Sequence, residues 1–484
     1  MSVNKHKKNN HVNRTLAIII IASFCLLILA FGMSHPRKRE IPVLEDGGSI
    51  FMSYDGPVFP LTSSEAVPGI EVVREIEFDL SDYDVSYGYR GLRQSKIHDR
   101  YVLMNTTTED KTFTALYPYV SSFDSKLNPI ITVNGNEAET RLHSGMYSGD
   151  FSGAGSNTES LNLNEISSWE GYQALLADDA YIEAAFSDYP TLDEPVYVYE
   201  FSEISDGGSD AAAPTLSIEF SMDYNQTVVF TYGFNGGRYE PENNYSQRSF
   251  FIPAKDDYDY GRLRMLIVMG DDIASYDIQG YQNGGCKLGE EIEGAEAVIR
   301  RYETTLGDIL KTITTAHYEQ SIRTTAVDEV APLIAGGISE EMFYGELCRV
   351  FKQYSIIGND TKERYQTGMV EDLLSDVEFY KRILYEAFEM TIPAGESISV
   401  EVEFKKRGSF DFGGTGGRNF GVTGYDFVTQ LGSVLSFKEQ SLVLSNDNGI
   451  EIVKQNVGID PVQNHAELDL NVEHYYLEVR STDK

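Results

Sequence analysis

The chain has 484 residues, of which 41% are hydrophobic and 24% charged; this length suggests about three domains, and the composition excludes wholesale disorder. Its formal charge is −36, and the first 40 residues hold seven Lys or Arg against one Glu, which leaves a net charge of −42 on residues 41–484. So acidic a surface excludes nucleic-acid binding through phosphate neutralisation and disfavours lying flat on an anionic bilayer.

The first predicted element is an uncharged apolar run from Leu16 to Met33. As a helix it extends about 27 Å, just enough to cross the hydrocarbon core. Four basic residues precede it and three follow, so the positive-inside rule weakly favours a cytoplasmic N-terminus. We expect a cytoplasmic stub at residues 1–15, a transmembrane helix at 16–33 and an extracytoplasmic remainder. A signal peptide cleaved near Ala30-Phe31-Gly32 is the alternative.

Only two cysteines, Cys286 and Cys348, lie beyond this run. Two are too few for a disulfide-stapled secreted domain, so the core must supply the stability. They either form one bridge or remain two reduced core residues. An exported domain that relies on its core fits a bacterial envelope better than a eukaryotic secretory route.

Residues 34–68 hold five of the fifteen prolines among Gly and Ser and are predicted to be a tether. From residue 69 apolar and charged residues alternate with period two, as in a half-buried strand. Residues 69–300 are therefore predicted to be a β-sandwich-like domain. A small helical insertion is expected, with Ser168 capping a helix through Leu176 and a second helix at Tyr181–Phe186.

Two hairpins are predicted within this domain. Asn134-Gly135 is typical of a two-residue turn, because both positions favour a positive φ. Alternating apolar residues at Leu216–Met222 and Val228–Tyr232 predict two strands of a second hairpin.

Residues 301–391 are predicted to be a helical module of three or four amphipathic helices. In the last helix Phe379, Ile383, Ala387 and Met390 recur at three- and four-residue spacing, and Pro393 ends the run. Period-two alternation then returns, so residues 392–484 are predicted to be a C-terminal β unit, with a hairpin turn at Asn448-Gly449.

The order β, α, β predicts an α+β multidomain protein. Its units are expected to be mainly antiparallel and sandwich-like, with an inserted helical module and one N-terminal transmembrane helix. One sandwich shared by the two β units and two separate sandwiches both fit this order.

Four stretches carry a resemblance: YRGLRQSKIHDRYVLMNTTTEDKTFTALYPYV, FTYGFNGGRYE, YDIQGYQNGGC and TGYDFVTQLGSVLSF. They resemble a group of uncharacterised single-pass, membrane-anchored extracytoplasmic proteins of Clostridia-type bacteria, over most of residues 60–480. The resemblance implies a bacterial, extracytoplasmic address. It brings no assigned activity, so no functional residue is carried over.

The eight histidines form no zinc motif, since neither HExxH nor CxxC spacing occurs. One set has the right chemistry if neighbouring strands bring it together: His465, Glu467, Glu473 and His474. A plain surface position is the alternative. No GxSxG or SxxK motif marks a nucleophilic serine, and the serines of SGMYSGDFSGAGS lie in a predicted loop without a partner.

Two further segments are weak candidates for ligand sites. Asp256, Asp257 and Asp259 have the carboxylate density of a calcium loop, but Tyr258 and Ile267 occupy two ligand positions of the EF-hand pattern. The Gly-rich run Phe412–Gly421 lacks phosphate-loop spacing and a following helix, so a hairpin loop is favoured. We expect no metal site and no cofactor, and no catalytic residue can be assigned.

Two basic clusters interrupt the acidic background: Lys405-Lys406-Arg407, and Arg90, Arg93, Lys96, His98 and Arg100. Arginine suits phosphates and carboxylates, so these clusters are candidates for gripping an anionic envelope polymer. Salt bridges within the protein are the alternative, because 74 acidic residues are available.

The favoured function is a membrane-tethered extracytoplasmic binding or structural protein of the bacterial cell envelope, non-enzymatic, whose partner is an envelope glycan, an anionic polymer or a protein. The first alternative is an envelope hydrolase that uses paired carboxylates on glycan or peptidoglycan. The second is the ectodomain of a sensor with a membrane partner.

Overall fold

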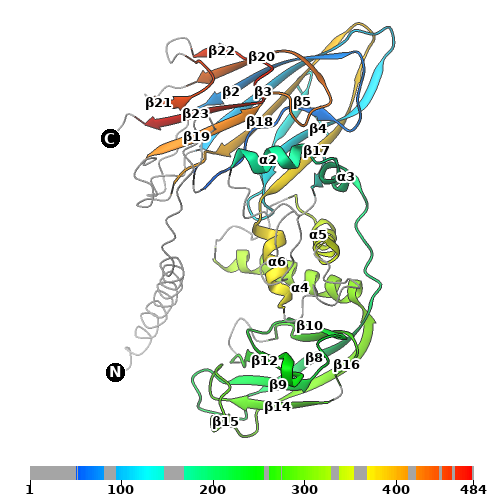
Figure 1. Cartoon of the computed structure of the whole chain (residues 1–484), viewed down its shortest axis with the longest axis vertical. Helices are drawn as coiled ribbons and strands as arrows, with labels where there is room; N and C mark the ends of the chain where they lie inside the picture. The colour runs from blue at the N-terminus through cyan, green and yellow to red at the C-terminus, as the bar shows by residue number, and fades with distance from the viewer. Residues whose placement is uncertain are drawn as a thin grey trace, which may run out of the picture. The chain divides into compact units, whose positions relative to one another are not determined.

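The computed structural model describes part of the chain (Figure 1): residues 51, 53–80, 94–145, 168–254, 261–273, 275–328, 337–353, 368–411, 421–445, 450–459 and 464–481. The chain divides into two units, residues 1–47 and 48–484, and all the described residues belong to the second. The predicted span at 16–33 lies outside the described residues. None of the helices that are described is long and apolar enough to cross a membrane.

One β layer is a seven-stranded sheet in the order β22-β20-β2-β3-β18-β5-β6. Its strands are β2 (Ile70–Asp79), β3 (Gln94–Asn105), β5 (Ile130–Val133), β6 (Asn136–Glu137), β18 (Ser397–Arg407), β20 (Ser436–Ser445) and β22 (His465–Glu467). Neighbours are antiparallel except β2 and β20, which are parallel. Strands from the two ends of the described chain lie side by side (Figure 1), so the two predicted β units share one sheet.

Two smaller sheets, in the orders β1-β4-β17-β7 and β19-β23-β21, form the opposite layer. Their strands are β1 (Thr62–Ser63), β4 (Lys111–Ser121), β7 (Arg141–Ser144), β17 (Arg382–Ile392), β19 (Val422–Val428), β21 (Ile450–Gln455) and β23 (His474–Ser481). Inward residues such as Phe427 and Leu477 join the core that contains Phe78 and Leu103 of the seven-stranded sheet. The two layers therefore enclose one hydrophobic core, as in a β sandwich.

Strand β17 contradicts the predicted last helix. Helix α6 (Val370–Phe379) ends at Phe379, and residues 382–392 are extended between β4 and β7. Alternate residues of β17 enter two different cores: Leu384 and Phe388 pack toward the sandwich interior, whereas Ile383 and Tyr385 pack against helices on the other face. Because both faces are buried over most of the strand, apolar residues occupy odd and even positions alike. Such a distribution is compatible with helical spacing as well as with strand spacing.

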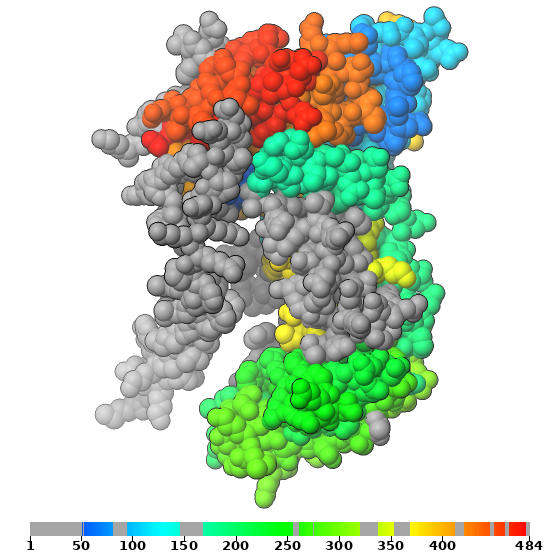
Figure 2. Space-filling view, viewed as in Figure 1, coloured from blue at the N-terminus to red at the C-terminus, as the bar shows by residue number. Residues whose placement is uncertain are grey.

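The helical insertion covers this second face of the β17 sheet. It consists of α2 (Trp169–Leu176) and α3 (Asp179–Phe186), which confirms the two predicted helices. Ser168 occupies the position before α2, but its side chain makes no capping hydrogen bond. Tyr172, Leu175 and Tyr181 share a core with Ile383 and Tyr385. Figure 2 shows this helical pair against the C-terminal strands, where Gln173 donates a hydrogen bond to Glu473.

The predicted hairpins have different outcomes. The turn at Asn134-Gly135 joins β5 to β6 with φ values of 49° and 75°, which confirms it. The second hairpin is wrong. Strand β9 (Thr215–Ser221) pairs with β12 and β14, whereas β10 (Thr227–Tyr232) pairs with β13 in another sheet. The connection crosses between two packed sheets, which alternation alone cannot distinguish from a hairpin. The turn at Asn448-Gly449 lies outside the described residues.

A further β unit, which we call the inserted β unit, lies between β7 and β17 in the chain. It has two packed sheets, β10-β13-β8-β16 and β11-β12-β9-β14-β15. The remaining strands are β8 (Pro195–Ser205), β11 (Gly236–Glu240), β12 (Tyr245–Phe251), β13 (Met265–Gly270), β14 (Tyr276–Tyr281), β15 (Glu291–Ile292) and β16 (Glu296–Thr305). The core between the sheets holds aromatic residues such as Phe201, Phe234 and Phe250.

Three helices pack on the free face of the β10-β13-β8-β16 sheet: α4 (Leu306–Asp328), α5 (Glu340–Gln353) and α6. Val198, Phe230 and Ile267 of that sheet share a core with Leu310 and Phe351 of the helices. A helical module is thus present from residue 306, but it ends at Phe379 rather than at 391.

Candidate functional site

The segment that leads into the sandwich is packed into the fold. The described part of the predicted tether, residues 51 and 53–68, includes Phe59 and Leu61, neither of which exposes any of its surface. Ser53 forms a two-way backbone bridge with Phe410. Val58 donates to the Asp426 carbonyl and accepts from the Val428 amide, each at 2.9 Å. These residues therefore do not form a free tether.

Asp426 of β19 binds three distant parts of the chain together. Its carboxylate accepts a hydrogen bond from the Tyr54 hydroxyl and contacts His474 Nε2 of β23 at 2.8 Å. The imidazole of His474 is stacked on the indole of Trp169 of α2, with ring centroids 4.4 Å apart and planes 2° from parallel. Burial is the main cause, with the Asp426 carboxylate second, of a strongly raised pKa for Tyr54.

Asp55, beside Tyr54, is bound by two lysines. Lys381 Nζ contacts one carboxylate oxygen at 2.5 Å, and Lys406 Nζ lies 3.6 Å from the other and donates to the Asp55 carbonyl at 2.9 Å. Lys406 is buried, and burial lowers its pKa although Asp55 and Asp426 act to raise it. We call Tyr54, Asp55, Lys381, Lys406, Asp426 and His474 the Asp426 cluster.

The Asp426 cluster has part of the chemistry of a nucleophilic site. A carboxylate that binds an imidazole is the base half of a catalytic triad. Within the part of the chain that the structure describes, no serine or cysteine side chain bonds to the His474 ring. The Trp169 ring covers one face of the imidazole. The cluster is thus suited to fixing Tyr54, β23 and α2 to the sandwich.

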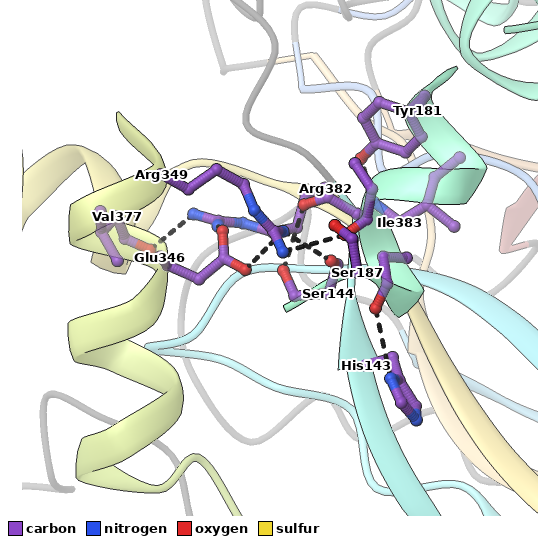
Figure 3. Close-up of polar contacts among 12 residues, drawn as sticks. His143, Ser144, Tyr181, Ser187, Glu346, Arg349, Val377, Arg382 and Ile383 are labelled. Atoms are coloured by element: carbon purple, nitrogen blue, oxygen red, sulfur yellow. Dashed lines mark hydrogen bonds and ion pairs between the residues drawn. The ribbon is translucent and has the colours of Figure 1, made fainter. Parts of the chain in front are cut away.

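A second buried cluster lies where α5 meets the sandwich (Figure 3). The Glu346 carboxylate of α5 accepts from Arg349 Nη1 at 2.9 Å and from Arg382 Nη1 of β17 at 3.0 Å. Glu346 and Arg382 expose none of their side chains, and Arg349 exposes 9%. Burial raises the pKa of Glu346, although both arginines act to lower it. We call these three residues the Glu346 cluster.

The two arginines also bind backbone carbonyls on three elements. Arg349 donates to Ser144 of β7 at 3.0 Å and to Ala184 of α3 at 2.9 Å. Arg382 donates to Val377 of α6 at 2.7 Å. The Glu346 cluster therefore joins the helical module to both the sandwich and its α2–α3 cover (Figure 3).

His143 of β7 lies beside this junction, with its Nδ1 3.2 Å from the Ala185 carbonyl. Partial burial lowers its pKa from the ordinary 6.5, although the Ala185 carbonyl acts to raise it. The unfolded chain then binds a proton more readily, so folding stability declines as the pH falls through about 6.5. We expect the unfolding midpoint to drop more between pH 7.5 and pH 5 in the wild type than in His143→Gln, as measured by circular dichroism. Equal drops would contradict this assignment.

The four residues weighed as a zinc-site candidate do not come together. His465 Nε2 lies 3.6 Å from Glu467, whereas His474 binds Asp426 and Glu473 accepts from Gln173. Among the described residues, no group of three or more His, Cys, Asp or Glu side chains is arranged to hold a metal ion. Cys286 and Cys348 are both free thiols, the first half-buried and the second buried.

Three residues of the basic clusters, Lys96, Arg100 and Lys406, are paired with acidic residues, as the alternative interpretation predicted. On the outer face of the seven-stranded sheet, Lys96 contacts Glu403 at 2.7 Å. Arg100 binds Glu75, Glu77 and Glu401 at 2.8–3.3 Å. These cations stabilise neighbouring strands and are largely neutralised for an anionic polymer.

Several candidate residues lie outside the described residues. They are Arg90, Arg93, the acidic run Asp256, Asp257 and Asp259, most of the Gly-rich run Phe412–Gly421, and the serines from Ser148 to Ser156.

Sequence reasoning missed the Asp426 and Glu346 clusters. One signal was available for the first: Lys406 continues the inward-facing positions of Val402 and Phe404 on β18, so a charge stands on an apolar face. Such a residue needs a buried partner. The partners themselves are distant in sequence, since Asp55 and Lys406 are 351 residues apart.

The stack of Trp169 on His474 gives a spectroscopic prediction, because Trp169 is the single tryptophan. In His474→Ala the indole loses its ring partner, and we expect its fluorescence maximum to shift to the red. Aromatic pairs contribute about 0.5–1.5 kcal/mol, so the amides of α2 should exchange with solvent up to roughly tenfold faster. The exposed His465→Ala is the control. Unchanged emission would show that α2 docks without this contact.

Comparisons with known proteins assign no role to these residues. No family model matches the chain. No curated protein matches it either. The functional argument therefore depends on the geometry of the two clusters.

Proposed function

We propose that this protein is a membrane-tethered extracytoplasmic binding or structural protein of the bacterial envelope, without catalytic activity. The observation that carries the proposal is the Asp426 cluster. It fixes Tyr54 and Asp55, which lie within the segment predicted as a tether, to the sandwich that also contains the last described strands. In a membrane-anchored domain, force on a bound partner is transmitted to the anchor through the segment that joins the anchor to the domain. That segment therefore needs a stable attachment to the domain, which the Asp426 cluster provides.

In this arrangement the inserted β unit is the part that is available to bind a partner. It leaves the sandwich after β7 and returns at β17, and the Glu346 cluster joins its helices to the sandwich through buried, charge-assisted hydrogen bonds. Contacts of this kind transmit a load between the units without relying on the connecting segments. The resemblance to single-pass envelope proteins of Clostridia-type bacteria and the apolar run at 16–33 support the same address.

Protease treatment of intact cells from which the wall has been removed tests the topology. We expect residues 41–484 to be degraded while the cytoplasm stays protected. Full protection of this region would overturn the extracytoplasmic assignment.

A thermal-shift series on residues 41–484 tests the binding role, with wall glycans, anionic polymers and calcium as probes. A ligand at one hundred times its dissociation constant stabilises the folded state by about 2.7 kcal/mol, which raises the unfolding midpoint by several degrees. A shift with a glycan or polymer supports a binding role and identifies the class of partner. Hydrolysis of a labelled wall preparation, lost on a single Asp or Glu substitution, would replace the proposal by the hydrolase alternative.

A further inference from the structure

Among the described strands, β21 has a neighbour on one edge only. It lies at the end of the sheet β19-β23-β21, and among the strands that the structure describes it pairs only with β23. A shallow hollow of about 670 Å³ runs along it and is lined entirely by its six residues, Ile450–Gln455. Val453 exposes 41% of its surface. An exposed edge of this kind presents unpaired backbone groups to which a further strand can bond.

The charged residues of this strand stand opposite residues of the opposite sign on β23. Glu451 stands opposite Arg480 of β23, and Lys454 stands opposite Glu478. Arg480 and Glu478 are two residues apart, so they lie on one face of the sheet. The register shift between Ile452 and Lys454 places Glu451 and Lys454 on that same face, although they are three residues apart. In a regular strand they would point to opposite faces.

This order is self-complementary. We propose that β21 pairs antiparallel with β21 of a second copy of the chain, around a two-fold axis between Ile452 and Val453. Glu451 then stands opposite Lys454 of the partner subunit, and Lys454 stands opposite Glu451 of the partner subunit. Because both residues share a face, the two charges of each pair meet directly across the new strand boundary.

The pairing also continues the charge order of β23. Across the four neighbouring strands, the residues that stand opposite one another are Arg480, Glu451, Lys454 of the partner subunit and Glu478 of the partner subunit. The sign of the charge therefore alternates from each strand to the next. The exposed Val453 becomes covered by Ile452 of the partner subunit. The two-fold symmetry makes the contact closed, which limits the assembly to a dimer.

One strand pair buries less than the roughly 1,200 Å² of a standard protein interface, so the dimer is expected to be weak. The net charge of −36 also opposes association. Local alternation of sign at β21 offsets this repulsion, and added salt screens the long-range part of it. The proposal concerns a second partner surface and does not depend on the proposed binding role or on the membrane address.

Two charge reversals test the pairing on the full chain in detergent, by sedimentation velocity and native mass spectrometry. In Glu451→Lys and in Lys454→Glu alike, each homodimer faces two like-charged pairs. We expect the dimer dissociation constant to rise about tenfold in each variant. In an equimolar mixture of the two variants every introduced charge faces its opposite, so the heterodimer should form with nearly the wild-type constant.

Lys405→Glu and Glu439→Lys serve as matched controls, because both residues are exposed on the seven-stranded sheet. They should leave dimerisation unchanged. A wild-type chain that stays monomeric up to about 0.2 mM, or a mixture that dimerises no better than either variant alone, would overturn the proposal. A dimer insensitive to both reversals would overturn it as well, since it would form elsewhere.

Discussion

Replacing Glu346 by Gln is expected to lower the free energy of unfolding by about 3–5 kcal/mol. The substitution keeps the size of the side chain but removes its charge. Arg349 and Arg382 would then remain buried without their shared carboxylate, 9% and 0% exposed. Removing one partner of a buried ion pair is costly because the remaining charge has lost its hydration. Chemical denaturation followed by circular dichroism measures the change.

Glu341→Gln is the matched control, because Glu341 lies on the same helix and is exposed. Surface substitutions of this kind change stability by no more than about 0.5 kcal/mol. Hydrogen exchange locates the effect: in Glu346→Gln the amides of α5, α3 and β7 should lose protection, since Arg349 binds carbonyls of α3 and β7. A loss of less than 1 kcal/mol would show that the cluster contributes little to the junction.

The sequence predicts strands best where only one face is buried. Strand β18 alternates Ile398, Val400 and Val402 with Ser399 and Glu401, and the structure confirms it. The turn at Asn134-Gly135 is equally local, because its backbone preference needs no distant partner. Each of these patterns is contained in about ten consecutive residues, so it can be recognised without knowledge of distant contacts.

Residues 382–392 show where this reading fails. Their strand is buried on both faces by two cores that are assembled from distant segments, including α2 and the seven-stranded sheet. Neither core is visible in a short window, so the apolar spacing was compatible with a helix. The predicted hairpin of β9 and β10 is wrong for the same reason. The sequence predicts both strands, but only their packing assigns them to different sheets.

The candidate site could be predicted only in part. Arg74 lies between Val72 and Ile76, and Asp99 between Ile97 and Tyr101, so each is a charged residue on the apolar face of an alternating strand. The pattern predicts that such residues have buried partners. It does not pair them, because the pairing depends on strand register. The contacts of Tyr54 with Asp426 and of Asp55 with Lys406, across more than 350 residues, are beyond this reasoning altogether.

The pair of Arg74 and Asp99 inside the sandwich gives the second large effect. Arg74 Nε and Nη2 each donate to the Asp99 carboxylate at 2.8 Å, and neither side chain is exposed. The hydroxyls of Tyr101 and Tyr117 also donate to Asp99, at 2.6 and 3.2 Å. We expect Asp99→Asn to lower the free energy of unfolding by about 3–5 kcal/mol, because Arg74 keeps its charge in a buried position without its carboxylate partner.

Two further variants separate the charge from the packing. Glu137→Gln changes an exposed carboxylate of the same sheet and should have no measurable effect on denaturation. Arg74→Met combined with Asp99→Leu removes both charges, and replacing a buried ion pair by apolar residues is often neutral. The double variant should therefore recover most of the stability lost in Asp99→Asn. If it is no more stable than Asp99→Asn, the hydrogen bonds to Tyr101 and Tyr117, and not the unpaired charge of Arg74, hold this core together.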